Sequence, residues 1–174
     1  QASLKESPYF EYEQVHINYP VHIPEGYNEA WYLQSPNLPQ ALTISGLNID
    51  GRLDNGVYPF ILDLMSERGE LIESKPVTLY VSKEVRYDSG YQVPELYAEQ
   101  GVPMTESFLF KNPDKISGVT GLPEGLSFNT STKQLEGTPT EVGKFVLEAS
   151  FLSSSDKWYL ELIVGENFGI LRTI

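Results

Sequence analysis

The sequence predicts an all-β chain built from two small β-sandwiches in tandem. Three observations support this fold class. A two-part sequence motif, the repeated phrase, occurs twice; the composition favours strands; and turn-forming residues recur throughout. Eleven Tyr and eight Phe among 174 residues, together with Val, Ile and Thr, suit half-buried pleated surfaces. Twelve Pro and fourteen Gly interrupt the chain too often for long helices. Many short strands separated by turns are typical of a sandwich or barrel.

The repeated phrase sets the number of domains. Its clearer copy is Leu122-Pro123-Glu124-Gly125-Leu126, then Gly137-Thr138-Pro139, then Gly143-Lys144-Phe145. The earlier copy is Leu38-Pro39-Gln40-Ala41-Leu42, then Ile49-Asp50-Gly51, then Gly56-Val57-Tyr58. The copies lie about 83 to 87 residues apart, which fits two domains near the ~100-residue size of one sandwich. We therefore expect domains at residues 1–84 and 85–174, joined by the polar segment 83–92.

The strands of the first domain follow from alternation and from turn signals. Residues 1–7 are polar and are expected to be loose. From Phe10 to Tyr19, strand-forming residues alternate with polar ones until Pro20 and Pro24 end the pattern. Further strands are expected at 29–33, at 42–44, within 46–51, at 57–65 and, after a hairpin loop at 67–70, at 75–82.

The second domain repeats this arrangement. Strands are expected at 95–97 and 107–110, separated by a turn at 99–103. The second copy of the phrase follows, then a strand at 145–151, a hairpin loop at 153–156 and a last strand at 158–164. Both domains thus end in an alternating run, Val77-Thr78-Leu79-Tyr80-Val81 in the first and Leu160-Glu161-Leu162-Ile163-Val164 in the second.

The second copy of the phrase resembles immunoglobulin-like (Ig-like) and dystroglycan-type cadherin-like repeats, which are common in bacterial surface and secreted proteins. The resemblance covers residues 92 to 165 and rests on the phrase quoted above. The first copy departs from the family pattern, because Ala41 replaces a glycine and Gly51-Arg52-Leu53 stands in place of Gly-Thr-Pro. We interpret it as a diverged relative with the same fold. The resemblance implies tandem Ig-like or cadherin-like sandwiches that act as non-catalytic spacer, adhesion or ligand-binding modules.

Charge and composition exclude several classes of partner and site. The net charge of −12 disfavours binding to nucleic acid and to anionic lipid. The absence of cysteine excludes disulfides and Cys-ligated zinc. Apolar stretches long enough to span a bilayer are also missing, so we expect no membrane insertion. The sequence opens with Gln1-Ala2-Ser3 and no Met, which fits a processed product or a domain cut from a longer protein, and we expect an extracytoplasmic location.

Aromatic residues crowd the first third of the chain and give the candidate binding site. The candidates for contact with a ligand are Tyr9, Tyr12, Tyr27, Trp31 and Tyr32, with Phe10 and Tyr19 nearby in the sequence. Exposed aromatic rings stack on sugars or anchor protein partners. The default interpretation is that these rings pack in the core or across strands, and if a binding face exists it is expected here.

Metal binding and catalysis receive little support. His16 and His22 are separated by Pro20 and have no His-x-His spacing, so ordinary structural roles are expected. Residues 48–56 contain oxygen ligands of the kind that calcium prefers, but they lack the closing Glu of an EF-hand. No cofactor is expected. Calcium stays open as an alternative at 48–56, or at Glu84 and Asp88 near the domain boundary.

The leading functional hypothesis is a non-enzymatic adhesion, binding or spacer module of an exported or cell-surface bacterial protein. Its partners would be a protein or glycan ligand, or neighbouring domains of a longer chain. Two alternatives remain: a carbohydrate-binding accessory module of a secreted enzyme, and a small hydrolase with paired carboxylates. The first requires exposed aromatic rings on one face, and the second requires two acids in one concave pocket.

Overall fold

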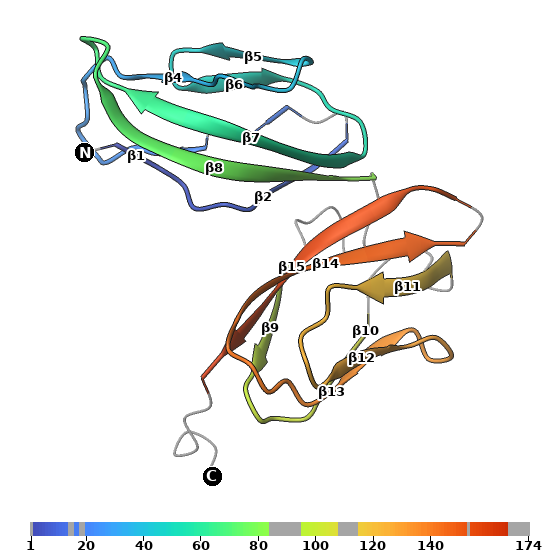
Figure 1. The fold of residues 1–174 in the computed structure, drawn as a ribbon. Helices are drawn as coiled ribbons and strands as arrows, with labels where there is room; N and C mark the ends of the chain where they lie inside the picture. Colours follow the sequence, from blue (N-terminus) through green and yellow to red (C-terminus); the bar gives the residue numbers. More distant parts are fainter. Residues whose placement is uncertain are drawn as a thin grey trace. The chain divides into compact units, whose positions relative to one another are not determined.

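The protein folds as two compact all-β units, Gln1–Lys83 and Glu84–Ile174. A computed structural model describes residues 2–13, 16–17, 20–83, 95–107, 115–152 and 154–166. Within these ranges the regular structure consists of strands, without an α-helix (Figure 1). The all-β fold class expected from the sequence is therefore confirmed.

Unit 1 is a sandwich around one four-stranded sheet. Its strands are β1 (Ser3–Leu4), β2 (Tyr9–Tyr12), β3 (Val21–His22), β4 (Tyr32–Gln34), β5 (Leu42–Ser45), β6 (Asn48–Gly51), β7 (Gly56–Met65) and β8 (Leu71–Ser82). The main sheet has the order β2-β8-β7-β4, with β2 parallel to β8 and the other pairs antiparallel. The β5–β6 hairpin forms a second layer (Figure 1). β1 pairs with β3.

Unit 2 has the same plan. Its strands are β9 (Glu95–Glu99), β10 (Met104–Ser107), β11 (Ile116–Thr120), β12 (Leu126–Asn129), β13 (Gln134–Gly137), β14 (Gly143–Phe151) and β15 (Lys157–Gly165). The main sheet has the order β11-β14-β15-β9, and its first strand, β9, again runs parallel to its last, β15. The facing sheet has the order β10-β13-β12.

The phrase that occurs twice in the sequence forms the same hairpin in both units. In unit 1 the hairpin strands pair with Leu42 opposite Gly51, and in unit 2 they pair with Leu126 opposite Gly137. Each hairpin is followed by a glycine that begins the long strand of the main sheet, β7 or β14. The duplication read in the sequence is thus a duplication of backbone structure.

Glycine is required in this hairpin because two backbones approach closely. Gly51 and Gly137 have φ values of 131° and 125°, which L side chains rarely adopt. A methyl group on Gly51 would overlap the carbonyl oxygen of Ala41, and one on Gly137 would overlap that of Gly125. Ala41 therefore occupies the place of Gly125. Among the described residues, Lys133 is the one non-glycine residue with positive φ, so the backbone at Ala41 is compatible with its side chain.

Each unit has its own apolar interior and its own buried tryptophan. In unit 1 the core joins the main sheet to the β5–β6 hairpin and includes Leu42, Ile49, Leu62 and Leu79. In unit 2 the buried apolar residues include Ile116, Leu126, Leu135, Leu147, Leu160 and Leu162. Trp31 is 7% exposed in unit 1 and Trp158 is 1% exposed in unit 2. Because the chain has two Trp in all, the fluorescence of each tryptophan reports on the unfolding of one unit.

Residues 2–4 belong to the fold of unit 1, so the expectation that the segment 1–7 is loose was wrong for its described part. β1 pairs with β3, with Leu4 opposite Val21. Ala2 and Leu4 are 3% and 4% exposed and belong to the core of unit 1. The backbone N–H of Leu4 also donates to Glu73 Oε1 at 2.7 Å. Two apolar side chains, Ala2 and Leu4, among polar ones gave too weak an alternation to be recognised as a strand.

Several strand limits differ from those expected. The strand expected at 29–33 is observed as β4, and β8 begins at Leu71 rather than at residue 75. Cross-strand pairing extends β8, because Leu71 is opposite Met65 across the hairpin. The sequence pattern did not reveal β11. Tyr19, Glu84, Asp88, residues 108–110 of the strand expected at 107–110, and 84–92 of the expected linker lie outside the described residues.

The close approach of backbones in unit 2 predicts that alanine lowers the stability of unit 2 much more at Gly125 than at Gly118. Gly125 has φ 96°, and a methyl group there would overlap the carbonyl oxygen of Thr138. We expect Gly125→Ala to destabilise unit 2 by at least about 2 kcal/mol. Gly118→Ala is the control, since a methyl group there meets nothing within 4 Å, and its cost should stay within about 0.5 kcal/mol.

The measurement is urea unfolding followed by Trp158 fluorescence in a Trp31→Phe background, so that unit 2 alone is observed. Equal midpoints for the two alanine variants would contradict the proposed role of Gly125.

A second prediction concerns Tyr9, which packs against the core of unit 1 and donates to the carbonyl of Lys5 at 2.9 Å. Burial, with Glu6 and Glu73 nearby, raises the pKa of Tyr9 to about 12. A raised folded-state pKa stabilises the neutral form, so this contribution is complete below pH ~10 and is lost as pH rises toward 12. We expect the stability of unit 1 to fall between pH 10 and 12, and to fall less steeply in Tyr9→Phe.

Urea unfolding at pH 8, 10 and 11.5, followed by Trp31 fluorescence in a Trp158→Phe background, measures this slope. Parallel pH profiles for the parent and for Tyr9→Phe would show that Tyr9 ionisation is not coupled to folding.

Candidate functional site

The aromatic residues expected to bind a ligand do not form one surface. Tyr9 and Tyr12 lie on β2 and Tyr32 lies on β4, which are opposite edges of the main sheet of unit 1. Tyr12 is 3% exposed, whereas Tyr9 and Tyr32 are half-buried. The order of the strands therefore separates residues that are neighbours in the sequence.

Tyr27 and Trp31 form a pair that belongs to the core. Their ring centroids are 5.5 Å apart with an interplanar angle of 83°, which is a favourable edge-to-face arrangement. Trp31 is part of the buried cluster and Tyr27 packs against it. Burial, with Glu29 nearby, raises the pKa of Tyr27. These two rings stabilise the sandwich, and Tyr32 is the aromatic candidate left beside an open recess.

The recess beside Tyr32 is a groove of about 530 Å³ in unit 1. Its lining comes from the edge strand β4, from the segment after it and from the adjacent strands: Tyr32, Leu33, Gln34, Ser35, Pro36, Ile44, Gly46 and Asp63. We call this the β4 groove. Aromatic, amide, hydroxyl and carboxylate groups thus meet in one concave site, which is a common composition of ligand sites.

Strand pairing builds the β4 groove. β4 pairs with β7, which places Gln34 opposite Asp63 and Tyr32 opposite Met65, while Leu33 faces the core beside Leu64. Alternation along a strand therefore presents Tyr32, Gln34 and Asp63 on one face of the sheet. The backbone N–H of Leu33 donates to the carbonyl of Gly46 at 2.9 Å, which brings the β5–β6 turn against the other edge of β4.

The segment that follows β4 is fixed by Asn37. Its Oδ1 accepts a hydrogen bond from the backbone N–H of Ile61 at 2.8 Å. The backbone N–H of Asn37 in turn donates to Ser35 Oγ at 3.3 Å. Ser35 and Pro36 are thereby held against β7, so one wall of the groove is rigid before any ligand arrives.

Two polar groups of the groove are available to a ligand. Across the described part of the chain, the hydroxyl of Tyr32 and the side-chain amide of Gln34 have no hydrogen-bond partner. The carboxylate of Asp63 accepts a hydrogen bond from Ser74 Oγ. An amide offers both donors and an acceptor, and a phenol offers one of each. The site can therefore make directional hydrogen bonds beside an aromatic ring.

Sequence reasoning identified Tyr32 but missed Gln34, Ser35 and Asp63. Asp63 is thirty-one residues from Tyr32 in the sequence, and the two meet through the pairing of β4 with β7. The turn signal Ser35-Pro36-Asn37 immediately after a strand was visible in the sequence. This turn signal indicated where the loop after the strand begins, but not which strand the loop faces.

The sequence also gave no sign of the large apolar side chain that is most exposed among the described residues. Tyr97 on β9 is 70% exposed, and its hydroxyl donates to Glu95 Oε1 at 2.7 Å. That hydrogen bond raises the pKa of Tyr97. Tyr97 lines a smaller recess of about 280 Å³ in unit 2, together with Val102 and Met104. This recess is more apolar than the β4 groove and offers fewer polar groups.

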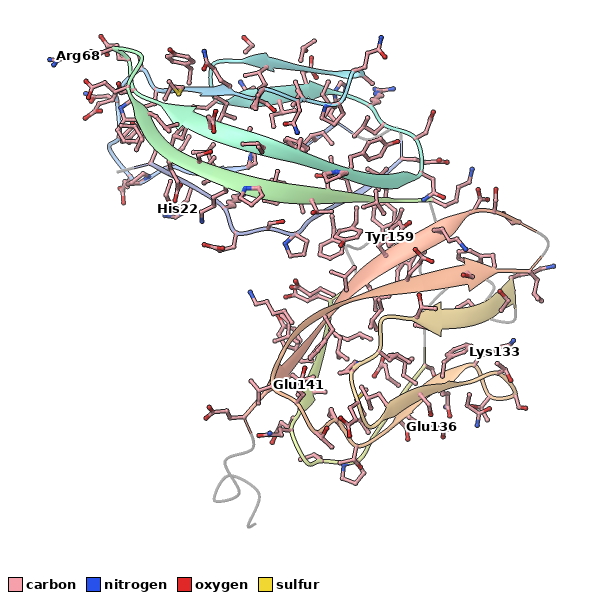
Figure 2. All side chains as sticks on the ribbon, viewed as in Figure 1. His22, Arg68, Lys133, Glu136, Glu141 and Tyr159 are labelled. Carbon is pink, nitrogen blue, oxygen red and sulfur yellow. The ribbon has the colours of Figure 1, made fainter. Side chains whose placement is uncertain are left out.

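The two histidines have ordinary surroundings. His22 lies on β3 and is exposed (Figure 2). His16 Nδ1 lies 2.8 Å from Asp50 Oδ1, and its Nε2 lies 3.3 Å from Arg52 Nη2. Arg52 can only donate, so Nε2 accepts and Nδ1–H donates to Asp50. Both nitrogens are therefore engaged in contacts on an exposed surface.

The segment at 48–56 consists of β6 of the repeated hairpin and the link from β6 to the start of β7. Asp50 Oδ1 accepts from the backbone N–H of Gly51 at 3.0 Å as well as from His16. Asn55 Nδ2 donates to the carbonyl of Val81 at 2.7 Å. Within the described ranges no group of three or more His, Asp or Glu side chains is arranged to hold a metal ion. Calcium binding, at 48–56 or at Glu84 and Asp88, stays a prediction.

Over the residues that the structure describes, no helix combines the length and apolar character needed to cross a bilayer.

Solved structures with similar architecture are distant in sequence. Human mucin-like protocadherin EC1-2 is 15% identical, with coverage of 96% of this chain and 99% of that one and a TM-score of 0.34. The Bacteroides ovatus protein SGBP-B of a mixed-linkage glucan utilization locus is 11% identical, with coverage of 94% and 67% and a TM-score of 0.32. An endo-fucoidan hydrolase of glycoside hydrolase family 107 is 17% identical, with a TM-score of 0.33. The match covers 79% of this chain, which spans 24% of that hydrolase.

The sequence itself matches a family model. No curated protein matches the chain. The model described as "Putative Ig domain" matches residues 71–157, which is half of the chain, and includes the clearer copy of the repeated phrase. The match begins in β8 of unit 1 and ends at the start of β15 in unit 2. The resemblance inferred from the phrase is confirmed: the chain belongs to the Putative Ig domain family and has an Ig-like and cadherin-like β-sandwich fold.

Proposed function

We propose that this chain is a non-enzymatic binding or adhesion module of an exported or cell-surface bacterial protein. Ig-like domains are typical of extracellular binding and adhesion, and this chain carries the same sandwich plan twice. The observation that carries the proposal is the β4 groove, where a preformed wall and unengaged polar groups of Tyr32 and Gln34 face solvent. A tandem arrangement of sandwiches also suits a spacer that holds such a site away from a surface.

The composition of the groove favours binding over hydrolysis. Hydrolysis of a glycosidic bond by paired acids requires two carboxyl groups on either side of the bond. Among the described residues that line the β4 groove, Asp63 is the single acid. The recess beside Tyr97 likewise includes one acid, Glu99. Neither recess brings together the pair of acids that this reaction needs.

The proposal is tested with fluorescent beads coated with the full chain. The beads are applied to polysaccharide gels, to a layer of epithelial cells and to beads that carry a second copy of the chain. We expect retention on at least one surface, loss of retention after thermal unfolding of the coat, and no release of reducing sugar from the gels.

Beads coated with the unfolded chain serve as the control for non-specific adhesion. Release of reducing sugar in proportion to the amount of folded protein would contradict a non-enzymatic role. Absence of retention on all three surfaces would contradict a binding or adhesion role.

A further inference from the structure

We infer that the β4 groove of unit 1 is a binding site for a neutral glycan, with Tyr32, Gln34 and Asp63 as the contact residues. The inference deepens the proposed function and rests on it, since it gives the module a ligand class and a location for that ligand. It is carried by three properties of the groove: its hydrogen-bonding groups, its charge and its rigidity.

The hydrogen-bonding groups match sugar hydroxyls. A hydroxyl both donates and accepts, so it is recognised best by groups that offer both functions side by side. The amide of Gln34 and the hydroxyl of Tyr32 supply donors and acceptors, and Asp63 supplies an acceptor on the opposite strand. The Tyr32 ring adds an apolar surface for the C–H face of a sugar. A purely apolar ligand would leave these polar groups unsatisfied, which is costly.

The charge of the groove selects against anionic sugars. None of the described residues that line it is Lys or Arg, and Asp63 contributes a negative charge. The chain as a whole has a net charge of −12, which repels polyanions. Sulfated or uronic-acid polymers are therefore disfavoured. A cationic peptide is favoured less than a neutral glycan, because only one of the lining residues is acidic.

The rigidity of the groove supports binding rather than chance exposure. The Ser35–Asn37 wall is attached to β7 through the hydrogen bond from Ile61 N to Asn37 Oδ1. The floor is attached to the β5–β6 turn through the hydrogen bond from Leu33 N to Gly46 O. A methyl group on Gly69 would lie 3.6 Å from the Tyr32 hydroxyl, so this hydroxyl lies beside the β7–β8 turn. Preformed walls reduce the entropy lost when a ligand is ordered.

The test is affinity electrophoresis of the full chain in gels that contain laminarin, xylan, galactomannan or polygalacturonate. We expect at least one of the three neutral polymers to retard the chain, and polygalacturonate not to do so. Gln34→Ala and Tyr32→Ala should each weaken this binding about tenfold. The matched control is Tyr97→Ala, which removes a more exposed tyrosine from unit 2 and should leave binding unchanged.

Folding of the two groove variants is checked by Trp31 fluorescence in a Trp158→Phe background, and folding of Tyr97→Ala by Trp158 fluorescence in a Trp31→Phe background. Gln34 is exposed and has no partner among the described residues, so its substitution tests binding without a structural cost. Retardation by none of the neutral polymers, stronger retardation by polygalacturonate, or competition by a lysine-rich peptide would overturn the inference. Wild-type affinity in both groove variants would do the same. If the coated beads of the proposed-function test are still retained when any of these outcomes is found, the proposed binding module stands and only the ligand class or its location is wrong.

Discussion

The backbones of two strands approach so closely in the small hairpin of each unit that a glycine must lie at the contact. Gly51 faces the carbonyl of Ala41, and Gly137 faces that of Gly125, with φ values that other residues rarely adopt. This contact sets the register that places Leu42 opposite Gly51 and Leu126 opposite Gly137. Register matters because a shift of one residue would turn the apolar side chains of the hairpin away from the core.

The rest of each sandwich follows from that register. Once the hairpin is fixed, Leu42 and Ile49 in unit 1, and Leu126 and Leu135 in unit 2, are directed into the interior. They meet the alternating apolar residues of the long central strands, which are fully buried at Leu62, Leu79, Leu147 and Leu162. In both units the first strand of the main sheet then pairs in parallel with the last. Burial of these side chains supplies most of the stabilisation.

The proposed site arises from the edges that this plan leaves open. β4 is an edge strand of unit 1, and the β5–β6 turn approaches it from the second layer. The space between them forms the β4 groove, lined by residues from β4, β5 and β7. Loops and edges of a rigid scaffold can vary without loss of the core, which is why binding residues gather there. The buried Trp31 precedes β4 directly and is in edge-to-face contact with the partly buried Tyr27.

The sequence by itself determined the all-β class, the family, the duplication and most strand positions, because glycines, prolines and alternation act locally and are visible along the chain. It also identified Tyr32 as a candidate. Only the tertiary structure decided that Tyr12 and Trp31 are buried, that Ala2 and Leu4 enter the core, and that Asp63 joins Gln34 beside Tyr32. These outcomes depend on which strands are neighbours in the sheet, and residues far apart in sequence meet through hydrogen-bonded pairing that no local pattern specifies.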